Sequence, residues 1–599
     1  MSILVRNLYT KCLTSFLPIT KVHESFYKNY SKSRMQLQMN EAIILYEEGS
    51  NQFSMWFRYI NSELNVDRLF NFNRQVNEPI NKFLQRMNNN IQAYNLKKYR
   101  RKHKKIAKRK NETSEEEEIN GVENNIKFVR NESILDGNLT CKSLLEDFAN
   151  IKLVISDIEY VVKQNVPYVN KIVLPSSILV NFPTYPSKLE IRNADKAKSI
   201  FNWYKNNNHT WTHVGQGYLY VPNTSDMGCY LKISCEPRNE TECGPIVETI
   251  SNSIVQHGPG QCPFDIRHAF TRNKLFGKSF RITSYNILAN VYSATSLSKE
   301  TLYPYCPQYA LSIDYRKLLI LKELIGYNSD IICLQEVDIN VYKHDLLPAL
   351  SELNYDGTYN LKNEQYEGLA IFYNQERFDQ LTCDYSVISQ GINLEEFNSV
   401  WSLIQNDDVK KTFLNRNTIV QVVVLRSKEN PEILIIGNTH LYFLPQADHI
   451  RLLQAYYSLV YLRTFANKMK AEHPECNVSI LYCGDFNSAP EKAVYQLMTQ
   501  NYVPEDHTDW LSNPEELVEN VSIKHDTNLA SACGTPEYTN YTATFSGCLD
   551  YIFYQVDNLQ VEQVIPIPSK EELSAHTGLP SVVFPSDHIS LCVDLKWLK

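Results

Sequence analysis

From Arg281 onward, short apolar runs alternate with amphipathic segments. Runs such as IICLQEV and VQVVVL are typical of buried strands, whereas YRKLLILKELIGY has the spacing of a helix. Two further strand-like runs, GCLDYIFY and SDHISLCVDLKW, follow near the end of the sequence. This alternation predicts an α/β region, a mixed sheet or sandwich with helices on its faces.

The pattern before residue 260 is different. Residues 36–60 predict two strands joined by a polar turn, and a helix with Pro79 at its first position is expected next. The expected apolar face of that helix consists of Ile80, Phe83, Leu84, Met87, Ile91 and Tyr94. Short alternating runs from about residue 124 to 254 predict a β-rich accessory module. Within it, the segments around Trp203 and from Tyr220 to Cys235 resemble immunoglobulin-like sandwiches.

A strongly basic run interrupts the accessory region. Residues 97–110 hold ten Lys or Arg in fourteen positions, and Glu112 and Glu115–Glu118 follow directly. Such blocks rarely build a core, so the run predicts a solvated loop whose two halves neutralise each other. An RNA-gripping arm and a nuclear localisation signal are the alternative interpretations.

The N-terminal residues are basic and almost free of acids. Residues 1–34 contain six Lys or Arg with several Ser and Thr, and Glu24 is the only acid before Glu41. This pattern resembles a mitochondrial transit peptide and favours the mitochondrial matrix; a disordered basic N-terminus is the alternative.

Bulk composition excludes some classes of protein. A chain of 599 residues is expected to form two or more domains, and no apolar run is long enough for a membrane-spanning helix. The net charge of −7 means that any nucleic-acid footprint is local. Fourteen cysteines without a C-x-x-C pair predict reduced, buried thiols, with a set of disulfides as the alternative.

Polar residues recur at the ends of the apolar runs of the second half. They are Asn286, Glu336, His440, Asp485, Asn487, Asp550, Asp587 and His588. Each is an ordinary turn or surface residue when taken alone, but together they supply oxygen ligands for a hard cation, a base for water and donors for a phosphate. Carboxylate and amide oxygens predict Mg²⁺, with Mn²⁺ as a substitute, and Glu336 is the strongest single candidate ligand.

Six short blocks occur in a fixed order. They are SYNILA (284–289), LQEVD (334–338), NTHL (438–441), GDFNS (484–488), GCLDYIF (547–553) and SDHI (586–589). This series resembles the signature of the endonuclease/exonuclease/phosphatase superfamily, and segments such as YNILANVYS resemble its branch of CCR4-type poly(A) deadenylases. The resemblance implies a four-layer α/β (α+β) sandwich as the catalytic domain.

The resemblance also implies roles for the polar set. Asn286 and Glu336 are expected on the metal side, with Asp485 and Asn487 completing the metal shell. Asp485 would polarise the attacking water and Asn487 would hold the phosphate or the metal shell.

The remaining members of the set would act on the phosphate. His588 would donate to a phosphate oxygen, with Asp587 or Asp550 orienting its ring, and His440 would be a second donor. A competing assignment makes His588 the base.

Substrate contacts are expected at four positions. Pro445 and Phe545 match residues that sandwich an adenine in the deadenylase branch, although Phe545 is equally compatible with a core position. Arg316 is a candidate for a neighbouring phosphate, with a surface salt bridge as the alternative. Asn286 is the fourth.

These expectations combine into one layout. Residues 1–34 would be a transit peptide, 35–260 a β-rich accessory domain with a charged loop near 97–120, and 261–599 the catalytic domain. The resemblance implies a Mg²⁺-dependent phosphodiesterase, a 3′ exoribonuclease that releases 5′-AMP from 2′,5′-oligoadenylates and from poly(A) tails of mitochondrial RNA. The alternatives are a phosphomonoesterase of the same fold acting on a 2′-phosphorylated nucleotide, and a non-catalytic RNA-binding scaffold.

Overall fold

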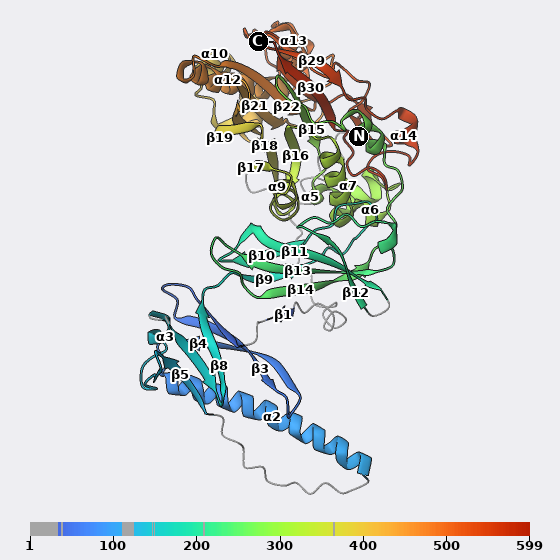
Figure 1. Cartoon of the computed structure of the whole chain (residues 1–599). Helices are drawn as coiled ribbons and strands as arrows, with labels where there is room; N and C mark the ends of the chain where they lie inside the picture. The colour runs from blue at the N-terminus through green and yellow to red at the C-terminus, as the bar shows by residue number, and fades with distance from the viewer. Residues whose placement is uncertain are drawn as a thin grey trace.

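The computed structural model describes residues 34–36, 40–110, 125–146, 148, 150–207, 210–362 and 366–598. The predicted transit peptide, apart from Arg34, lies outside these residues, as does the acidic run after Lys110. Three parts follow one another along the molecule: an N-terminal sheet with a long helix, a smaller middle sheet, and two large sheets formed by the C-terminal half (Figure 1). No helix in the described part of the chain is long and apolar enough to cross a membrane.

Two six-stranded sheets form the C-terminal half. The first contains, from edge to edge, β17 (Tyr355–Leu361), β18 (Glu367–Asn374), β16 (Ile331–Asp338), β15 (Ser279–Asn286), β30 (Leu591–Trp597) and β29 (Leu559–Val564). The second contains β19 (Phe378–Val387), β20 (Ile419–Ser427), β21 (Glu432–His440), β22 (Asn477–Asp485), β28 (Asp550–Gln555) and β25 (Leu529–Ser531). The central pairs β15–β16 and β21–β22 are parallel, so the carboxyl ends of the two strands in each pair lie side by side.

The two sheets pack face to face with helices outside them. The core between them is apolar and includes Ile282, Cys333, Ile436, Cys483 and Val593. The longer helices are α7 (Ile313–Gly326), α10 (Glu395–Trp401), α11 (Asp407–Leu414), α12 (Asp448–Glu472) and α13 (Ala493–Gln500). Apolar side chains of α7 join the core on the outer face of the first sheet, and those of α12 join the core on the second. The predicted four-layer sandwich is confirmed, because both faces of the central strands are buried.

Short elements complete this half of the chain. The helices are α4 (Pro263–Arg267), α5 (Asn290–Ser293), α6 (Gln308–Leu311), α8 (Ile339–Val341), α9 (Leu347–Ser351) and α14 (Lys570–Ser574). The strands are β23 (Tyr502–Val503), β24 (Ile523–Lys524), β26 (Asn540–Tyr541) and β27 (Ser546–Gly547). The thirteen cysteines that the structure describes are all free, as the sequence predicts.

The middle part is a five-stranded sheet with a two-stranded companion. The larger sheet contains β1 (Arg34–Gln36), β14 (Ile246–Ile254), β13 (Tyr230–Arg238), β11 (Asp195–Asn207) and β12 (Thr210–Gln216), and the smaller contains β10 (Lys188–Arg192) and β9 (Tyr168–Val173). Trp203 and Cys235, which suggested a sandwich, are both fully buried. Their core is continuous with the core around α7, so the middle sheet packs directly on the C-terminal half.

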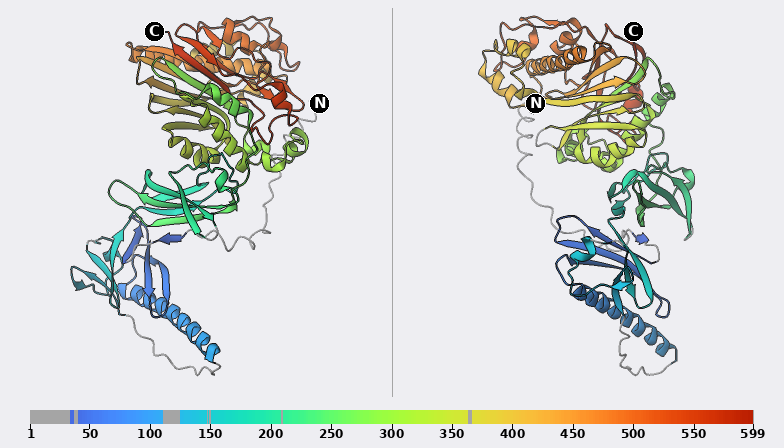
Figure 2. Two further views of the ribbon diagram at one scale, coloured as in Figure 1. Left: turned by 45° about the vertical axis from the view of Figure 1, so that its right-hand side comes forward. Right: turned by 60° about the vertical axis from the view of Figure 1, so that its left-hand side comes forward.

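The N-terminal part has its own core. Its seven-stranded sheet contains β4 (Val66–Gln75), β3 (Gln52–Asn61), β2 (Glu41–Tyr46), β8 (Ile158–Gln164), β7 (Ile151–Ile155), β5 (Ile126–Arg130) and β6 (Ser133–Ile134). Helix α2 (Ile80–Lys110) covers this sheet, and α3 (Lys142–Glu146) lies beside it. Both views of Figure 2 place α2 at the end of the molecule far from the two large sheets.

Helix α2 confirms one prediction and corrects another. It begins at Ile80, one residue after the predicted first position, and Ile80, Phe83, Met87 and Ile91 are fully buried against the sheet. The prediction of a loop from residue 97 is wrong up to Lys110, because the helix continues through the whole basic run. This run contains no Gly or Pro and consists mainly of Lys and Arg, which are good helix formers.

Candidate active site

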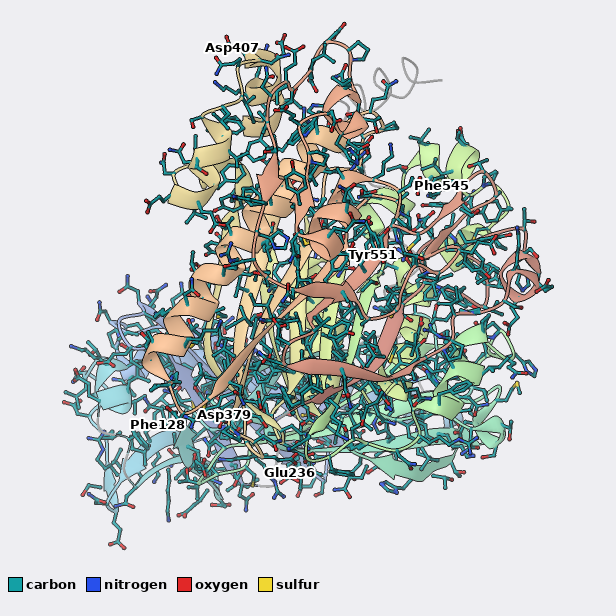
Figure 3. All side chains as sticks on the ribbon, turned by 90° about the horizontal axis from the view of Figure 1, so that it is seen from above. Phe128, Glu236, Asp379, Asp407, Phe545 and Tyr551 are labelled. Atoms are coloured by element: carbon teal, nitrogen blue, oxygen red, sulfur yellow. The ribbon has the colours of Figure 1, made fainter. Side chains whose placement is uncertain are left out.

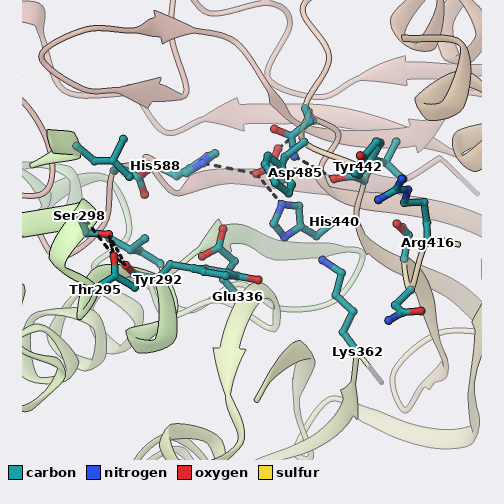
Figure 4. Close-up of a pocket in the computed structure, with 18 of the residues that line it drawn as sticks. Tyr292, Thr295, Ser298, Glu336, Lys362, Arg416, His440, Tyr442, Asp485 and His588 are labelled. Atoms are coloured by element: carbon teal, nitrogen blue, oxygen red, sulfur yellow. Dashed lines mark hydrogen bonds and ion pairs between the residues drawn. The ribbon is translucent and has the colours of Figure 1, made fainter. Parts of the chain in front are cut away.

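A cavity of about 360 Å³ opens where the ends of the central strands of the two sheets meet (Figure 4). Six residues of the predicted polar set line it: Glu336, His440, Asp485, Asn487, Asp587 and His588. The other two members, Asn286 and Asp550, are buried and hold the lining residues by hydrogen bonds. The strand ends therefore bring the whole predicted set together.

Glu336 lies on β16, where the register of this strand against β18 shifts and the backbone of Glu336 adopts a left-handed conformation with φ 55°. Asn286 Nδ2 donates to its Oε1 at 3.0 Å, and the backbone N–H of Ala289 donates to its Oε2 at 3.0 Å. Burial, with the charges of Asp587 and Glu367 nearby, raises the pKa of Glu336 to about 7. The carboxylate is thus fixed in place, and its ionisation is unfavourable without a nearby cation. Both properties are expected of a ligand that a cation neutralises.

Asp485 lies at the centre of the site, at the end of β22. Asn286 Nδ2 donates to its Oδ2 at 3.0 Å, and the backbone N–H of Asn487 donates to its Oδ1 at 2.9 Å. The Nε2 atoms of two histidines face the same Oδ2, His440 at 3.6 Å and His588 at 3.5 Å. Burial, with the charge of Asp550, raises the pKa of Asp485. A single carboxylate therefore links both sheets and both histidines.

His588 is paired with Asp550. Its Nδ1 lies 2.8 Å from Asp550 Oδ2, and Thr539 Oγ1 donates to the same oxygen at 2.6 Å. Burial alone would lower the pKa of His588, but the carboxylates of Asp550 and Asp485 outweigh it and raise the pKa well above its ordinary value. Of the two carboxylates expected to orient this ring, the structure places Asp550 in contact with it, and the raised pKa favours the imidazolium form of His588.

His440 is in the opposite charge state. Burial, together with the nearby cations Lys362 and His588, lowers the pKa of His440 well below its ordinary value. Its buried Nδ1 contacts no hydrogen-bond partner among the described residues. The site thus presents one charged and one neutral imidazole on either side of Asp485, two different donors for one anionic group.

Asp587 forms its hydrogen bond with Tyr303 rather than with His588. Tyr303 Oη donates to Asp587 Oδ2 at 2.8 Å, and both residues line the cavity. Asn487 adds a contact of its own, because its Nδ2 donates to the carbonyl of Leu441 at 3.0 Å.

Sequence reasoning missed several lining residues, among them Tyr303, Lys362 and Arg416. Lys362 Nζ lies 3.3 Å from Glu367 and, in Figure 4, extends toward His440. Arg416 is anchored by its Nε to the carbonyl of Thr412 at 3.0 Å, and its guanidinium lies 4.3 Å from the ring centre of Tyr442. All three residues lie outside the six blocks: Tyr303 lies between α5 and α6, Lys362 directly follows β17, and Arg416 comes shortly before β20.

Arg316 corrects an expectation. It is completely buried, so it neither reaches a phosphate nor forms a surface salt bridge. Its guanidinium donates to the carbonyls of Leu311, Ile287, Leu288 and Pro585 and to Ser293 Oγ. Arg316 therefore braces the segment that follows β15 and presents the Ala289 N–H to Glu336.

The expected adenine sandwich stays a proposal. Pro445 and Phe545 are exposed and neither lines the cavity. Phe545 is 50% exposed, which makes the core interpretation of this residue wrong. Figure 3 shows Phe545 toward the outer edge of the molecule as seen from above.

Two places in the site could hold a metal ion. Oxygens of Asp485 and Asp550 and a nitrogen of His588 lie within 4.8 Å of one another. In this group His588 already lies between the two carboxylates, with its Nδ1 2.8 Å from Asp550 Oδ2 and its Nε2 3.5 Å from Asp485 Oδ2. At Glu336, by contrast, each oxygen accepts a single hydrogen bond and the side chain borders the cavity. A buried carboxylate that borders the cavity and keeps acceptor capacity on both oxygens fits a hard divalent cation such as Mg²⁺.

Comparisons with known proteins agree with this geometry. A sequence model of the Endonuclease/Exonuclease/phosphatase family matches residues 283–588, and a model of the 2′,5′-phosphodiesterase 12-like N-terminal domain matches residues 166–256. The chain is 38% identical over 491 residues to 2′,5′-phosphodiesterase 12 of Homo sapiens, covering 76% of this chain and 79% of that protein. The protein of the same name from Bos taurus is 39% identical with the same coverage.

The chain is also similar to a more distant relative. The CCR4-Not complex 3′-5′-exoribonuclease subunit Ccr4 of Schizosaccharomyces pombe is 32% identical over 352 residues, which cover 53% of this chain and 49% of that protein. The family model, over residues 283–588, contains all six strands of the second large sheet and every residue of the polar set, and it ends before β30 of the first sheet. The chain belongs to the endonuclease/exonuclease/phosphatase family, in the CCR4-like branch to which the 2′,5′-phosphodiesterase 12 proteins are also related.

Proposed function

We propose that this chain is a Mg²⁺-dependent phosphodiesterase that removes 5′-AMP stepwise from 2′,5′-linked oligoadenylates and from 3′,5′-linked poly(A). The observation that carries the proposal is the convergence of Glu336, Asp485 and His588 on one cavity from both sheets. The names of the relatives support the reaction class, because they describe a 2′,5′-phosphodiesterase and a 3′-5′-exoribonuclease.

The metal would be held on the Glu336 side of the cavity. Glu336 would bind it directly, and Asn286 would keep this carboxylate in place through its Nδ2. A bound divalent cation supplies Lewis-acid stabilisation of the negative charge on the phosphate.

Asp485 and the two histidines would act on the opposite side. Asp485, with its raised pKa, is suited to accept a proton from the attacking water. The His588 imidazolium would donate to a non-bridging phosphate oxygen, where negative charge accumulates in the transition state. Asp550 keeps that ring charged and oriented, and neutral His440 offers a second donor.

The rest of the cavity suits an oligonucleotide. A volume of about 360 Å³ lies in the range of small-molecule sites and accommodates a nucleotide-sized group. Arg416, whose Nη atoms contact no acceptor among the described residues, and Lys362 provide cations for a flanking phosphate. Pro445 and Phe545 would contact an adenine outside the cavity.

The test is product analysis. The purified chain would be incubated with 2′,5′-triadenylate and, separately, with 3′,5′-oligoadenylate, in Mg²⁺ or in EDTA. Metal-dependent release of AMP that Glu336→Ala abolishes is the expected result. Release of inorganic phosphate from a nucleotide monoester, with no cleavage of either oligoadenylate, would replace the proposal by the phosphomonoesterase alternative.

We further propose that the protein acts in the mitochondrial matrix. The basic, acid-poor sequence of residues 1–34 supports this location. Fractionation of cells and N-terminal sequencing of the mature protein test it: a matrix protein lacking the first residues is expected, and an uncleaved protein outside mitochondria would contradict it.

A further inference from the structure

Helix α2 and the edge strand β4 form a polar groove far from the catalytic cavity. Two hollows lie along it, of about 650 and 370 Å³. Lys82 and Arg86 of α2 face Asn73 of β4 across the first hollow. Lys97 of α2 lines the second together with Asn71 of β4. We call this feature the α2–β4 groove.

The charge of the groove is one-sided. The sequence from Ile80 to Lys110 contains no Asp or Glu, and ten of its last fourteen residues are Lys or Arg. Among the described residues, Glu78 is the only acid that lines either hollow, and it forms a buried ion pair with Arg74. Lys82, Arg86 and Lys97 are exposed and form no ion pair with any residue that the structure describes. The groove therefore presents free cations, although the net charge of the protein is negative.

The cations lie along one stripe of the helix. Positions 82, 86 and 97 are separated by four and eleven residues, spacings that repeat on one face of an α-helix. Ile80, Phe83 and Met87 occupy the buried face of the same helix. Because packing fixes the helix on its sheet, the stripe is held as a rigid row rather than as a flexible tail.

The groove also offers groups that fit bases and sugars. The Arg68 guanidinium lies 4.2 Å from the ring centre of Tyr94, and both residues line the second hollow. Amide side chains, including Asn71, Asn73 and Gln85, supply donors and acceptors along both hollows. Cations with aromatic and amide groups are the combination that binds single-stranded nucleic acid without strict sequence preference.

We propose that the α2–β4 groove binds single-stranded RNA. The charge complementarity between a row of unpaired cations and a phosphate backbone favours this occupant, and the amide and aromatic groups favour it over an acidic protein segment. The binding itself does not depend on the proposed catalytic function. A consequence for catalysis does rest on that function: long substrates would contact both the groove and the cavity, whereas a trinucleotide would contact only the cavity.

The first experiment measures binding. The full chain and its Lys82→Gln/Arg86→Gln/Lys97→Gln variant would be titrated, in EDTA, against a fluorescent oligouridylate of about 20 nucleotides over a series of salt concentrations. The Kd of the variant is expected to rise about 10-fold, and the slope of log K against log salt to fall by about 2, since each of three lost phosphate contacts contributes about 0.7.

A matched control removes three exposed lysines from other surfaces, Lys171→Gln/Lys411→Gln/Lys524→Gln. It has the same change of charge, so a Kd within twofold of wild type would assign the effect to the groove. Circular dichroism of both variants verifies folding, and Gln is a good helix former. An unchanged Kd and salt slope in the groove variant would overturn the proposal. Polyglutamate serves as the probe for an acidic protein segment: if the groove variant lost binding to polyglutamate but kept its binding to RNA, the proposal would also be overturned.

The second experiment separates the groove from the catalytic function. Cleavage of a long oligoadenylate and of triadenylate would be compared for the two triple variants. We expect kcat/KM on the long substrate to fall about 10-fold in the groove variant only, with triadenylate cleavage unchanged. If wild type cleaves neither substrate, the proposed function fails while the binding result still decides the groove. Equal loss on both substrates would overturn the role of the groove.

Discussion

At the scale of single residues, the site depends on carboxyl groups whose pKa values are raised by burial in the fold. Glu336 is the clearest case, since its pKa of about 7 lies far above its ordinary value of 4.5. In the metal-free protein its contribution to stability is present below pH 4.5 and is lost as the pH rises through 7. Metal binding requires the ionised form and therefore competes with the proton.

We expect the stabilisation by Mg²⁺ to depend on pH for this reason. The increase in the midpoint of thermal unfolding caused by millimolar Mg²⁺ should be small near pH 6 and large near pH 8. Glu336→Gln should remove the increase at both values. Differential scanning fluorimetry in Mg²⁺ and in EDTA measures it, and equal shifts of wild type at the two pH values would contradict the assignment of Glu336 as the ligand.

Asp550 and Asp587 are distinguishable by substitution. Asp550→Asn removes the charge that holds the pKa of His588 high, so kcat should fall by about 10²- to 10³-fold and its decline at alkaline pH should begin at lower pH. Asp587→Asn should shift that alkaline decline much less, because the charge of Asp587 is the smallest of the effects that raise the pKa of His588 and its carboxylate accepts from Tyr303 instead. The pH dependence of kcat for both variants is the measurement; identical profiles would show that Asp550 does not tune His588.

Arg416 should affect binding more than chemistry. Arg416→Gln removes one cation from the rim of the cavity while keeping a polar side chain of similar reach. KM for triadenylate is expected to rise by about 10-fold, with kcat changed less than twofold. Steady-state kinetics on tri- and diadenylate test this, and an effect confined to kcat would assign Arg416 a different role.

At the scale of elements, the strands and the six sequence blocks at their ends were predictable, but the buried side chains that hold these elements together, such as Arg316, were not. Strands with both faces buried give continuous apolar runs, and side chains at the ends of parallel strands must meet, so β15, β16, β21 and β22 were expected to form the site. Arg316 lay beyond prediction, because its partners come from segments up to 269 residues away. The basic run was misjudged because charge density indicated solvent exposure and said nothing about helix formation.

The buried Arg316 allows a stability prediction. Arg316→Met would leave several buried carbonyls without a donor, at a cost of about 3 kcal/mol or more. Arg426→Met, at a surface ion pair with Glu475, should cost less than about 1 kcal/mol. Urea unfolding of the two variants compares them, and similar midpoints would show that the brace contributes little.

At the scale of the whole molecule, the accessory region is divided by how its cores are shared. The core of the middle sheet includes residues on both sides of residue 260, whereas the N-terminal core involves residues 42–162 alone. Tyr185 in the middle part also donates to Asp345 in the catalytic half at 2.9 Å. The middle sheet and the catalytic half therefore form one packing unit.

Truncation tests this division. A chain beginning at residue 166 should stay folded and active on triadenylate, because it retains the whole shared core. A chain beginning at residue 261 should aggregate, since the apolar surface around α7 loses its cover. Soluble yield, circular dichroism and activity on triadenylate would be measured for both chains. A stable, active chain from residue 261 would show that the shared core is dispensable.

The left-handed backbone at Glu336 has a consequence for engineering. A side chain other than Gly in this conformation costs about 1 to 2 kcal/mol, and the raised pKa of the carboxyl adds to that cost in the metal-free protein. Glycine at position 336 would relieve both while removing the proposed ligand. Laboratory evolution that selects only for heat resistance would therefore favour losing this residue early, and screening for turnover in every round is the means of keeping it.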